Sequence, residues 1–513
     1  LQKAGARVEE RAAAEFRPAR GEEAFAEQFP DEEDLAEKAG AHPAAAGAAA
    51  ALLGYLQENH PVELPHLRPP AFYRVSDTMH LDAATQRNLE LVRPAVAGEG
   101  GVSLLGLLDK TCTGMGGRLL KKWVLAPLLS VGEIGCRADA VEEMVNEPAR
   151  LEALRETLGR VHDFERILGR VGLQTANGRD LVGLRASLSA LPEIEGALAG
   201  ASSAELAGIR ENWDSVPDIE EDLAVSLVDE PRLSLREGGL FRDGVDEELD
   251  RYRRASREGK DWLASYETEE RGRTGLPLKV GFNKVFGYYL ELPKRYSDSV
   301  PVEYSRKQTL VSAERYVTAE LKKIEDDLLG AEEKAKNLEY VLFGRLRGRI
   351  AAQSRRILAA AERVGRIDAL ASLAEAAVRG GYVRPVLDEG DTLEIIEGRH
   401  PVMEADPSLT FVPNDLRLNA ERQILILTGP NMAGKSTYLR QVALHVLMAQ
   451  IGGFVPARSA RIGLVDRVFT RVGAHDRLLE GKSTFMVEMV ETAAILREAT
   501  PRSLVVLDEV GRG

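Results

Sequence analysis

Apolar residues return at helical spacing over most of this chain, and strand-like runs are confined to a few places. In residues 319–379, leucine and isoleucine recur in steps of three or four residues or in multiples of such steps, which predicts a long helix. A second helical stretch, residues 246–270, comes earlier. At 1.5 Å per residue, an unbroken helix over residues 319–379 would extend roughly 90 Å. The pattern therefore predicts long lever helices in a mainly helical core.

Between these two helical stretches lies a segment with the pattern of a small β module. Residues 279–291 are rich in valine, phenylalanine and tyrosine and contain Gly281 and Gly287, and residues 302–311 follow after a proline-marked turn. β-Branched and aromatic residues bounded by glycine and proline are typical of short strands. We therefore expect a β tip that is carried between two long helices.

The last part of the chain changes to the pattern of an α/β domain. Residues 423–428 form a short apolar, β-branched run, which predicts a parallel strand covered on both faces, and residues 438–450 repeat apolar residues at helical spacing. Strand, loop and helix thus come in the order that a phosphate-binding loop requires. The nine residues between them contain the eight-residue pattern G-x-x-x-x-G-K-[ST] with every fixed position matched: Gly429, Pro430, Asn431, Met432, Ala433, Gly434, Lys435, Ser436 and Thr437.

The fixed residues of this loop have a chemical explanation. The glycines let backbone N–H groups close around the β-phosphate of a nucleoside triphosphate, Lys435 reaches the β and γ oxygens, and the Ser436 hydroxyl can ligate Mg²⁺. The alternative is an ordinary glycine turn that carries a lysine. The flanking strand and helix favour the nucleotide site.

A second acidic element follows the loop. Residues 504–507 are four apolar residues that run directly into Asp508 and Glu509, which is the pattern of a Walker B strand. In that interpretation Asp508 holds Mg²⁺ through water and Glu509 polarises the attacking water. The alternative is a solvent-exposed strand end, where acidic residues are common. A phosphate loop in the same expected sheet favours the catalytic interpretation.

Several sequence blocks together resemble one known family. T-G-P-N-M-A-G-K-S-T at residues 428–437, S-T-F-M-V-E-M at 483–489 and D-E-V-G-R-G at 508–513 resemble the ATPase domain of the MutS family of DNA mismatch-repair proteins. The resemblance extends over residues 53–513. Its upstream blocks resemble the family's core and its DNA clamp: residues 80–91, 103–120, 164–168, 278–289 and 306–310.

The resemblance implies roles for further residues. Phe411 matches the family's aromatic residue that stacks on adenine, and Asn431 matches a residue that contacts phosphate. Ser483 resembles the element that one subunit presents to the γ-phosphate held by its partner. On the sequence alone, a core position is an equally good interpretation of Phe411. For Ser483 the alternative is a helix N-cap, and one residue can serve as both. His400 matches a family pattern without an assigned chemistry, and we expect a structural role. In the clamp we expect DNA contacts from Lys279, Asn283, Lys284, Arg306, Lys307 and Arg315.

By this resemblance the protein is a DNA mismatch-repair ATPase, in which ATP and Mg²⁺ at a dimer interface reset long levers whose tips grip double-stranded DNA. The implied partners are a second copy of the chain, mismatched duplex DNA and a MutL-type repair protein. A shorter MutS paralogue that acts in recombination control remains the alternative, and whether this chain hydrolyses ATP alone stays open. A chromosome-structural ATPase, with a coiled-coil arm between its two nucleotide motifs, is excluded because Lys435 and Asp508 are only 73 residues apart.

The expected order of parts is a connector remnant, a helical core, a DNA clamp, a returning lever helix and an α/β P-loop ATPase domain of the ABC type. Their expected bounds are residues 1–63, 64–258, 259–318, 319–385 and 386–513. The chain starts without methionine and stops after the Walker B strand. We therefore expect a fragment that lacks the family's Phe-x-Glu mismatch reader and the C-terminal part of the ATPase domain.

Composition and charge limit these expectations further. Only Cys112 and Cys136 occur, without C-x-x-C spacing, so neither a disulfide framework nor a zinc site is indicated. The longest apolar run, residues 44–56, is too short to span a bilayer, and we expect a cytoplasmic, nucleoid-associated protein. A net charge of −14 would repel DNA phosphates overall. Residues 271–323 nevertheless carry eleven basic and five acidic residues, so we expect local DNA contacts.

Overall fold

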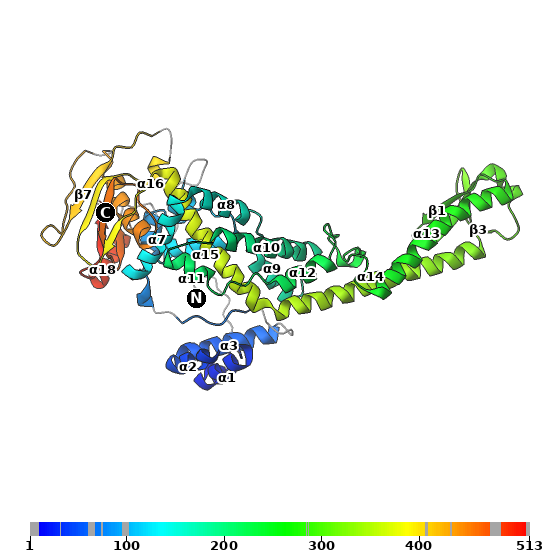
Figure 1. The fold of residues 1–513 in the computed structure, drawn as a ribbon, viewed down its shortest axis with the longest axis horizontal. Coiled ribbons are helices and arrows are strands. Elements are labelled where there is room, and N and C mark those ends of the chain that lie inside the picture. The colour runs from blue at the N-terminus through cyan, green and yellow to red at the C-terminus, as the bar shows by residue number, and fades with distance from the viewer. Residues whose placement is uncertain are drawn as a thin grey trace. The chain divides into compact units, whose positions relative to one another are not determined.

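The computed structural model describes residues 10–30, 32–59, 67–72, 75–94, 102–283, 285, 287–405, 409–430, 433–471 and 484–508. This part of the chain is mostly helical with small sheets, as the hydrophobic pattern predicts (Figure 1). It divides into two compact units. The first comprises Leu1–Gly169, Ala186–Val216 and Ser354–Gly513, and the second comprises Arg170–Arg185 and Pro217–Gln353. Among the helices of these described ranges, none is long and apolar enough to cross a membrane.

The second unit carries a small antiparallel sheet at the end of two long helices (Figure 1). The side chain of Asp246 caps the start of α13 (Glu247–Thr274), and the hydroxyl of Thr318 caps α14 (Ala319–Ala352), which packs along α13. The chain passes between the two helices through four strands, which pair in the order β1-β2-β4-β3. The predicted β module is therefore confirmed. The strands are β1 (Lys279–Asn283), β2 (Gly287–Pro293), β3 (Ser305–Thr309) and β4 (Ala313–Val317).

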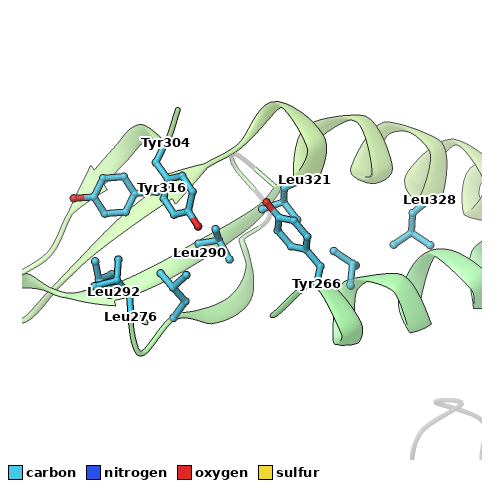
Figure 2. Packing of buried hydrophobic residues seen from close by; sticks show 10 residues of the cluster. Tyr266, Leu276, Leu290, Leu292, Tyr304, Tyr316, Leu321 and Leu328 are labelled. Atoms are coloured by element: carbon cyan, nitrogen blue, oxygen red, sulfur yellow. The ribbon is translucent and has the colours of Figure 1, made fainter. Parts of the chain in front are cut away.

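One apolar core joins this sheet to the helix pair (Figure 2). Leu290 and Leu292 of β2 and Tyr316 of β4 pack with Leu276 and Tyr304, while side chains of α13 and α14 close the core on the helical side. Burial of each large apolar side chain contributes roughly 1.5–3 kcal/mol. The sheet is therefore held on the helix pair by hydrophobic packing. The helical members of the core are Leu263, Tyr266, Leu321 and Leu328.

The prediction of one unbroken helix over residues 319–379 is wrong. The helix α14 ends at Ala352, and its C-cap Gln353 has φ −100° and ψ 12° and an N–H that bonds back to the carbonyl groups of Ile350 and Ala351. A second helix, α15 (Ser354–Gly380), follows at once. The two helices differ in environment, because α14 has one buried stripe, whereas α15 is packed on several sides by α5, α6, α7, α8 and α11. The break comes where this environment changes.

The remaining helices are mostly short. In the first unit, α1 (Pro18–Gln28), α2 (Glu33–Ala41) and α3 (Pro43–Asn59) share a small core around Phe25 and Phe29. Two helices, α9 (Phe164–Gly172) and α10 (Gly178–Ala197), contain residues of both units, and α12 (Pro217–Ser226) belongs to the second. The others are α4 (Ala83–Asn88), α5 (Leu104–Leu108), α6 (Gly114–Leu125), α7 (Val131–Asn146), α8 (Pro148–Leu158) and α11 (Ala204–Arg210).

The C-terminal part of the first unit contains two sheets. One has the order β5-β8-β6-β7, and in the other β9 and β10 run parallel. The predicted strand over residues 504–507 and the predicted helix over residues 438–450 are confirmed as β10 and α17. The bounds are β5 (Val386–Asp388), β6 (Leu393–Gly398), β7 (Asn414–Leu418), β8 (Ser459–Gly463), β9 (Val468–Arg471), β10 (Leu504–Leu507), α16 (Pro401–Glu404), α17 (Lys435–Gln450) and α18 (Thr484–Glu498).

The predicted buried strand over residues 423–428 is absent. These residues have no regular secondary structure, and Ile424 and Ile426 are each 80% exposed. The physical reason is that no strand among the described residues pairs with this run, so its apolar side chains have no sheet neighbours to cover them. The short apolar run therefore leads into the phosphate loop without forming a strand, with Ile424 and Ile426 exposed and Leu425 and Leu427 half-buried.

Candidate nucleotide site and nucleic-acid interface

The phosphate loop ends in the first turn of α17. Gly434 is the N-cap of this helix with φ 89°, and Gly429, at the other end of the loop, has φ 154°. Both conformations favour glycine, because a side chain there is strained. No side chain among the described residues caps the start of α17. Its first N–H groups are therefore open to an anion at the positive end of the helix dipole.

The lysine of the loop lies over the loop's own backbone. The Nζ group of Lys435 donates hydrogen bonds to the carbonyl oxygens of Gly429 at 2.6 Å and Pro430 at 2.9 Å. These two bonds hold the ammonium group of Lys435 close to the backbone at the start of the phosphate loop. A phosphate at this place would offer the same group stronger, charge-assisted partners.

The loop opens into a cavity of about 1120 Å³. Seven of the predicted site residues line this cavity, whereas Ser436 and Asp508 are not among its lining residues. Phe411 reaches it from the segment before β7, so the structure brings the predicted aromatic residue and the loop to one place. The seven residues are Phe411, Gly429, Pro430, Ala433, Gly434, Lys435 and Thr437.

The predicted metal ligand Asp508 follows the last residue of β10. Its N–H donates to the carbonyl of Arg471 at the end of β9 (2.7 Å), its side chain is largely buried, and α17 contacts β10. The two motif elements, loop helix and acidic strand, are therefore neighbours. Within the described ranges, no group of three His, Cys, Asp or Glu side chains could hold a metal ion. Four residues predicted for the nucleotide site lie outside the described residues: Asn431, Met432, Ser483 and Glu509.

Several lining residues were not predicted from the sequence. The hydroxyl of Tyr438, three residues after Lys435, donates to the carbonyl of Asp415 in β7 at 2.9 Å and so joins the loop helix to the opposite wall. Only its place on the first turn of the predicted helix could have pointed to Tyr438. The other lining residues come from segments whose proximity no local pattern encodes, among them Met403, Asn414, Arg417 and Arg422.

His400 has the structural role that was expected. Its Nδ1 accepts a hydrogen bond from the N–H of Met403 at 3.3 Å and thereby caps α16. Burial, with smaller contributions from His445 and Arg440, lowers the pKa of His400 to about 4. A neutral imidazole is the form that can accept this bond.

Five of the six predicted DNA-contacting residues lie on three of the four strands in the second unit. Lys279 and Asn283 are on the edge strand β1, and Arg306 and Lys307 are on the opposite edge strand β3. Lys279 and Lys307 are exposed, and Arg306 is 61% exposed although it also pairs with Glu314 at 3.2 Å. Exposed cations therefore lie along both edges of the sheet. Lys284 lies outside the described residues.

Arg315 differs from the other predicted contacts because its charge is balanced within the sheet. Its side chain is only 18% exposed, pairs with Glu291 at 2.9 Å and lies over the ring of Tyr289 at 4.3 Å. Cross-strand pairing puts Lys279, Glu291, Arg315 and Gln308 in one row. Arg315 thus has a structural role in the centre of this row.

Comparison with known proteins identifies the family. The family described as MutS domain III matches residues 84–374, more than half of the chain, and MutS domain V matches residues 425–513. The chain belongs to the MutS family. The fold features that the resemblance implied, a mainly helical core followed by the segment with the phosphate loop, fall within these two matches.

Similar MutS proteins occur in several bacteria. DNA mismatch repair protein MutS of Ruminiclostridium cellulolyticum is 52% identical over 473 residues, which cover 91% of this chain and 54% of that protein. The protein of the same name from Symbiobacterium thermophilum is 50% identical over 91% of this chain and 54% of its own. That of Pelotomaculum thermopropionicum is 49% identical over 97% and 58%. The chain spans about half the length of the curated relatives it matches.

Proposed function

We propose that the chain acts in DNA mismatch recognition and repair, binding ATP and Mg²⁺ at the cavity beside α17 and duplex DNA at the sheet of the second unit. The observation that carries this proposal is that the phosphate loop, Phe411 and β7 line one cavity although they are separate in the sequence. The relatives that match 91% of the chain are named DNA mismatch repair protein MutS, which supports the same function.

In the proposed site, different groups of the chain bind the phosphates and the adenine ring. The uncapped N–H groups of the first turn of α17, together with N–H groups of the loop, would hold the phosphates, and Asn431 would add a further phosphate contact. Lys435 turns from the loop carbonyl groups to the β and γ oxygens. Phe411 stacks on the adenine ring. The cavity volume of about 1120 Å³ lies just above the usual range for ligand sites, about 300–1,000 Å³, so the cavity is large enough for a nucleotide.

Metal binding and catalysis are proposed for residues near the end of β10. Ser436 would ligate Mg²⁺ through its hydroxyl and Asp508 through water, since magnesium prefers oxygen ligands and keeps several waters. Glu509 would orient the attacking water and take its proton. Bound ATP supplies the phosphoanhydride bond that is hydrolysed. Ser483 would reach the γ-phosphate of a second copy, which makes the proposed enzyme a homodimer.

DNA binding is proposed for the two edges of the sheet in the second unit. Lys279, Lys307 and Arg306 present exposed positive charge there. Asn283 of β1 and Lys284, which lies outside the described residues, are proposed as further contacts. Such contacts with phosphates hold a duplex without reading its sequence. Recruitment of a MutL-type protein and a cytoplasmic, nucleoid-associated location complete the proposal.

The direct test is to titrate labelled duplex DNA with the full chain at two salt concentrations, with and without an ATP analogue and Mg²⁺. We expect DNA binding that weakens steeply with salt and changes when nucleotide is added. Absence of DNA binding at low salt, or an affinity that ignores nucleotide, would contradict the proposal.

A further inference from the structure

One ten-residue segment, residues 82–91, contacts both halves of the candidate nucleotide site. We call it the junction segment. It contains α4, begins at the cap residue Asp82, and belongs to a sequence block with no role in the proposed site. Three of its residues, Thr85, Leu89 and Leu91, are buried. The block is therefore built into the interior of the first unit.

The first set of contacts joins the junction segment to β9. The Nδ2 group of Asn88 donates to the carbonyl of Thr470 at 3.1 Å and to its hydroxyl at 3.3 Å, and the N–H of Thr470 donates to the hydroxyl of Thr85 at 3.1 Å. The next residue along β9 is Arg471, whose carbonyl accepts the N–H of Asp508 at 2.7 Å. The junction segment is thus hydrogen-bonded to Thr470 of β9, and the next residue, Arg471, is hydrogen-bonded to the proposed metal ligand Asp508.

The second contact joins the junction segment to the phosphate-loop helix. Arg440 of α17 donates to the carboxylate of Glu90 at 3.2 Å. Glu90 has φ 52°, a left-handed conformation that a non-glycine residue rarely adopts, and the contacts around it must hold that conformation. The position of Glu90 is therefore set by its contacts, so that a movement of Arg440 would move Glu90 as well.

The far side of the junction segment is bonded to the helical core. The N–H groups of Leu104 and Leu105, at the start of α5, donate to the carbonyl groups of Glu90 and Leu91 at 3.0 and 2.9 Å. At the other end of α5, the hydroxyl of Ser372 in α15 donates to the carbonyl of Leu108 at 2.7 Å. Directional bonds therefore run from β9 and α17 through the junction segment to α5 and α15.

We propose that Thr85, Asn88 and Glu90 are positioning residues that pass a nucleotide-dependent shift of β9 and α17 to the helical core. The inference rests on the proposed function, because it needs a nucleotide beside α17 and DNA at the second unit. Removing one side chain uncouples the two partners without removing any group that touches either ligand. A residue of packing importance alone would change stability and leave the coupling intact.

The test is a comparison of coupling, measured in the full chain as the ratio of duplex DNA affinities with and without an ATP analogue and Mg²⁺. Couplings between binding sites are typically about 5–150-fold. We expect Asn88→Ala, Thr85→Val and Glu90→Gln to bring this ratio at least about fivefold closer to one. Affinity for the analogue alone and for DNA alone should each stay within about threefold of the parent, because neither ligand touches these residues.

Two variants serve as matched controls. Thr85→Ser keeps the hydroxyl and should keep the coupling, and Thr157→Val removes a buried hydroxyl in α8 and should also keep it. Melting temperatures establish that each variant is folded, and Asn88→Ala, at a half-buried position, is the mildest change. If folded Asn88→Ala and Glu90→Gln kept the parental coupling, this inference would be overturned, whereas the proposed function would stand. A parent chain that binds neither ligand would instead overturn the proposed function.

Discussion

At the scale of single residues, the two carboxylates after β10 have different expected tasks. Asp508 is largely buried and its N–H is hydrogen-bonded to β9, which suits a metal ligand held in place, whereas Glu509 is the residue proposed to handle the attacking water. We therefore expect Asp508→Ala to remove the Mg²⁺ dependence of nucleotide binding. Glu509→Ala should keep nucleotide affinity and lose hydrolysis by roughly 10²–10⁴-fold, the usual contribution of a general base.

Steady-state hydrolysis and equilibrium nucleotide binding, each measured against Mg²⁺ concentration, distinguish these two effects. Asp298→Ala, an exposed change in the second unit, is the control. Parental turnover by Glu509→Ala would remove this residue from the catalytic role.

The phosphate loop could be predicted residue by residue because its motif describes a local backbone. The glycine conformations at Gly429 and Gly434 and the start of α17 at Lys435 follow from positions that are adjacent in the chain. The opposite wall of the cavity could not be predicted, because Met403 and Asp415 come to line the same cavity as Tyr438 only in the folded structure. In the same way, the sequence shows that Arg315 is charged, but its pairing with Glu291 on the neighbouring strand could not be predicted from the sequence.

At the scale of elements, helix periodicity predicted more than strand composition did. The start of α13 and the start of α14 follow from side-chain caps that the sequence contains. The end of α14 at Ala352 could not be read, because apolar spacing continues across it while the surroundings change. Residues 423–428 have strand composition and no strand partner among the described residues, so composition alone was misleading there.

The start of α6 shows why one family-like block has its glycines. Asp368 of α15 accepts hydrogen bonds from the N–H groups of Cys112 and Thr113 and from the Thr113 hydroxyl, at 2.9, 2.7 and 2.6 Å. A Cβ atom at Gly116 would lie 2.3 Å from an oxygen of this carboxylate. The glycine therefore lets a buried acid approach the start of the helix.

Glu143 makes the joint between α7 and α11 sensitive to acid. Its side chain is 8% exposed and accepts hydrogen bonds from the N–H groups of Ser202 and Ser203 at 2.9 and 2.8 Å and from Arg150 at 2.5 Å. Burial by itself would raise the pKa of Glu143, but these hydrogen bonds outweigh it and lower the pKa to about 2. The folded pKa lies below the ordinary value of 4.5, so the stabilisation is complete above pH 4.5 and is lost as the pH falls toward 2.

We therefore expect Glu143→Gln to lower the free energy of unfolding by on the order of 1–3 kcal/mol near neutral pH. The difference from the parent should shrink as the pH is lowered, because the parent then loses the same charge. Urea unfolding at several pH values measures both quantities, with the exposed change Glu152→Gln as control. A difference that does not depend on pH would show that the charge of Glu143 contributes nothing.

At the scale of the whole molecule, a net charge of −14 and the proposed DNA binding are compatible only if positive charge is gathered locally. Lys279 and Lys307 present such charge on the two edges of the sheet in the second unit. Replacing both with alanine should weaken duplex binding and flatten the slope of log affinity against log salt. The expected change is at most two contacts' worth, at about 0.9 per phosphate.

Affinity titrations at several salt concentrations test this prediction. Lys121→Ala with Lys122→Ala, two exposed changes on α6, alters the net charge equally and serves as the control. An unchanged slope in the sheet variant, or an equal loss in the control, would mean that DNA binds elsewhere.

Nucleotide binding at the cavity beside α17 is the property on which the proposed catalysis and coupling depend. The most direct measurement is equilibrium binding of a labelled ATP analogue with Mg²⁺ to the full chain, to Lys435→Ala and to the exposed control Lys121→Ala. We expect saturable, Mg²⁺-dependent binding by the parent and the control, and at least about 100-fold weaker binding by Lys435→Ala. This lysine would make charge-assisted hydrogen bonds worth roughly 1.5–3 kcal/mol each. Parental affinity in a folded Lys435→Ala variant, or no binding by the parent chain, would contradict the assignment of this cavity.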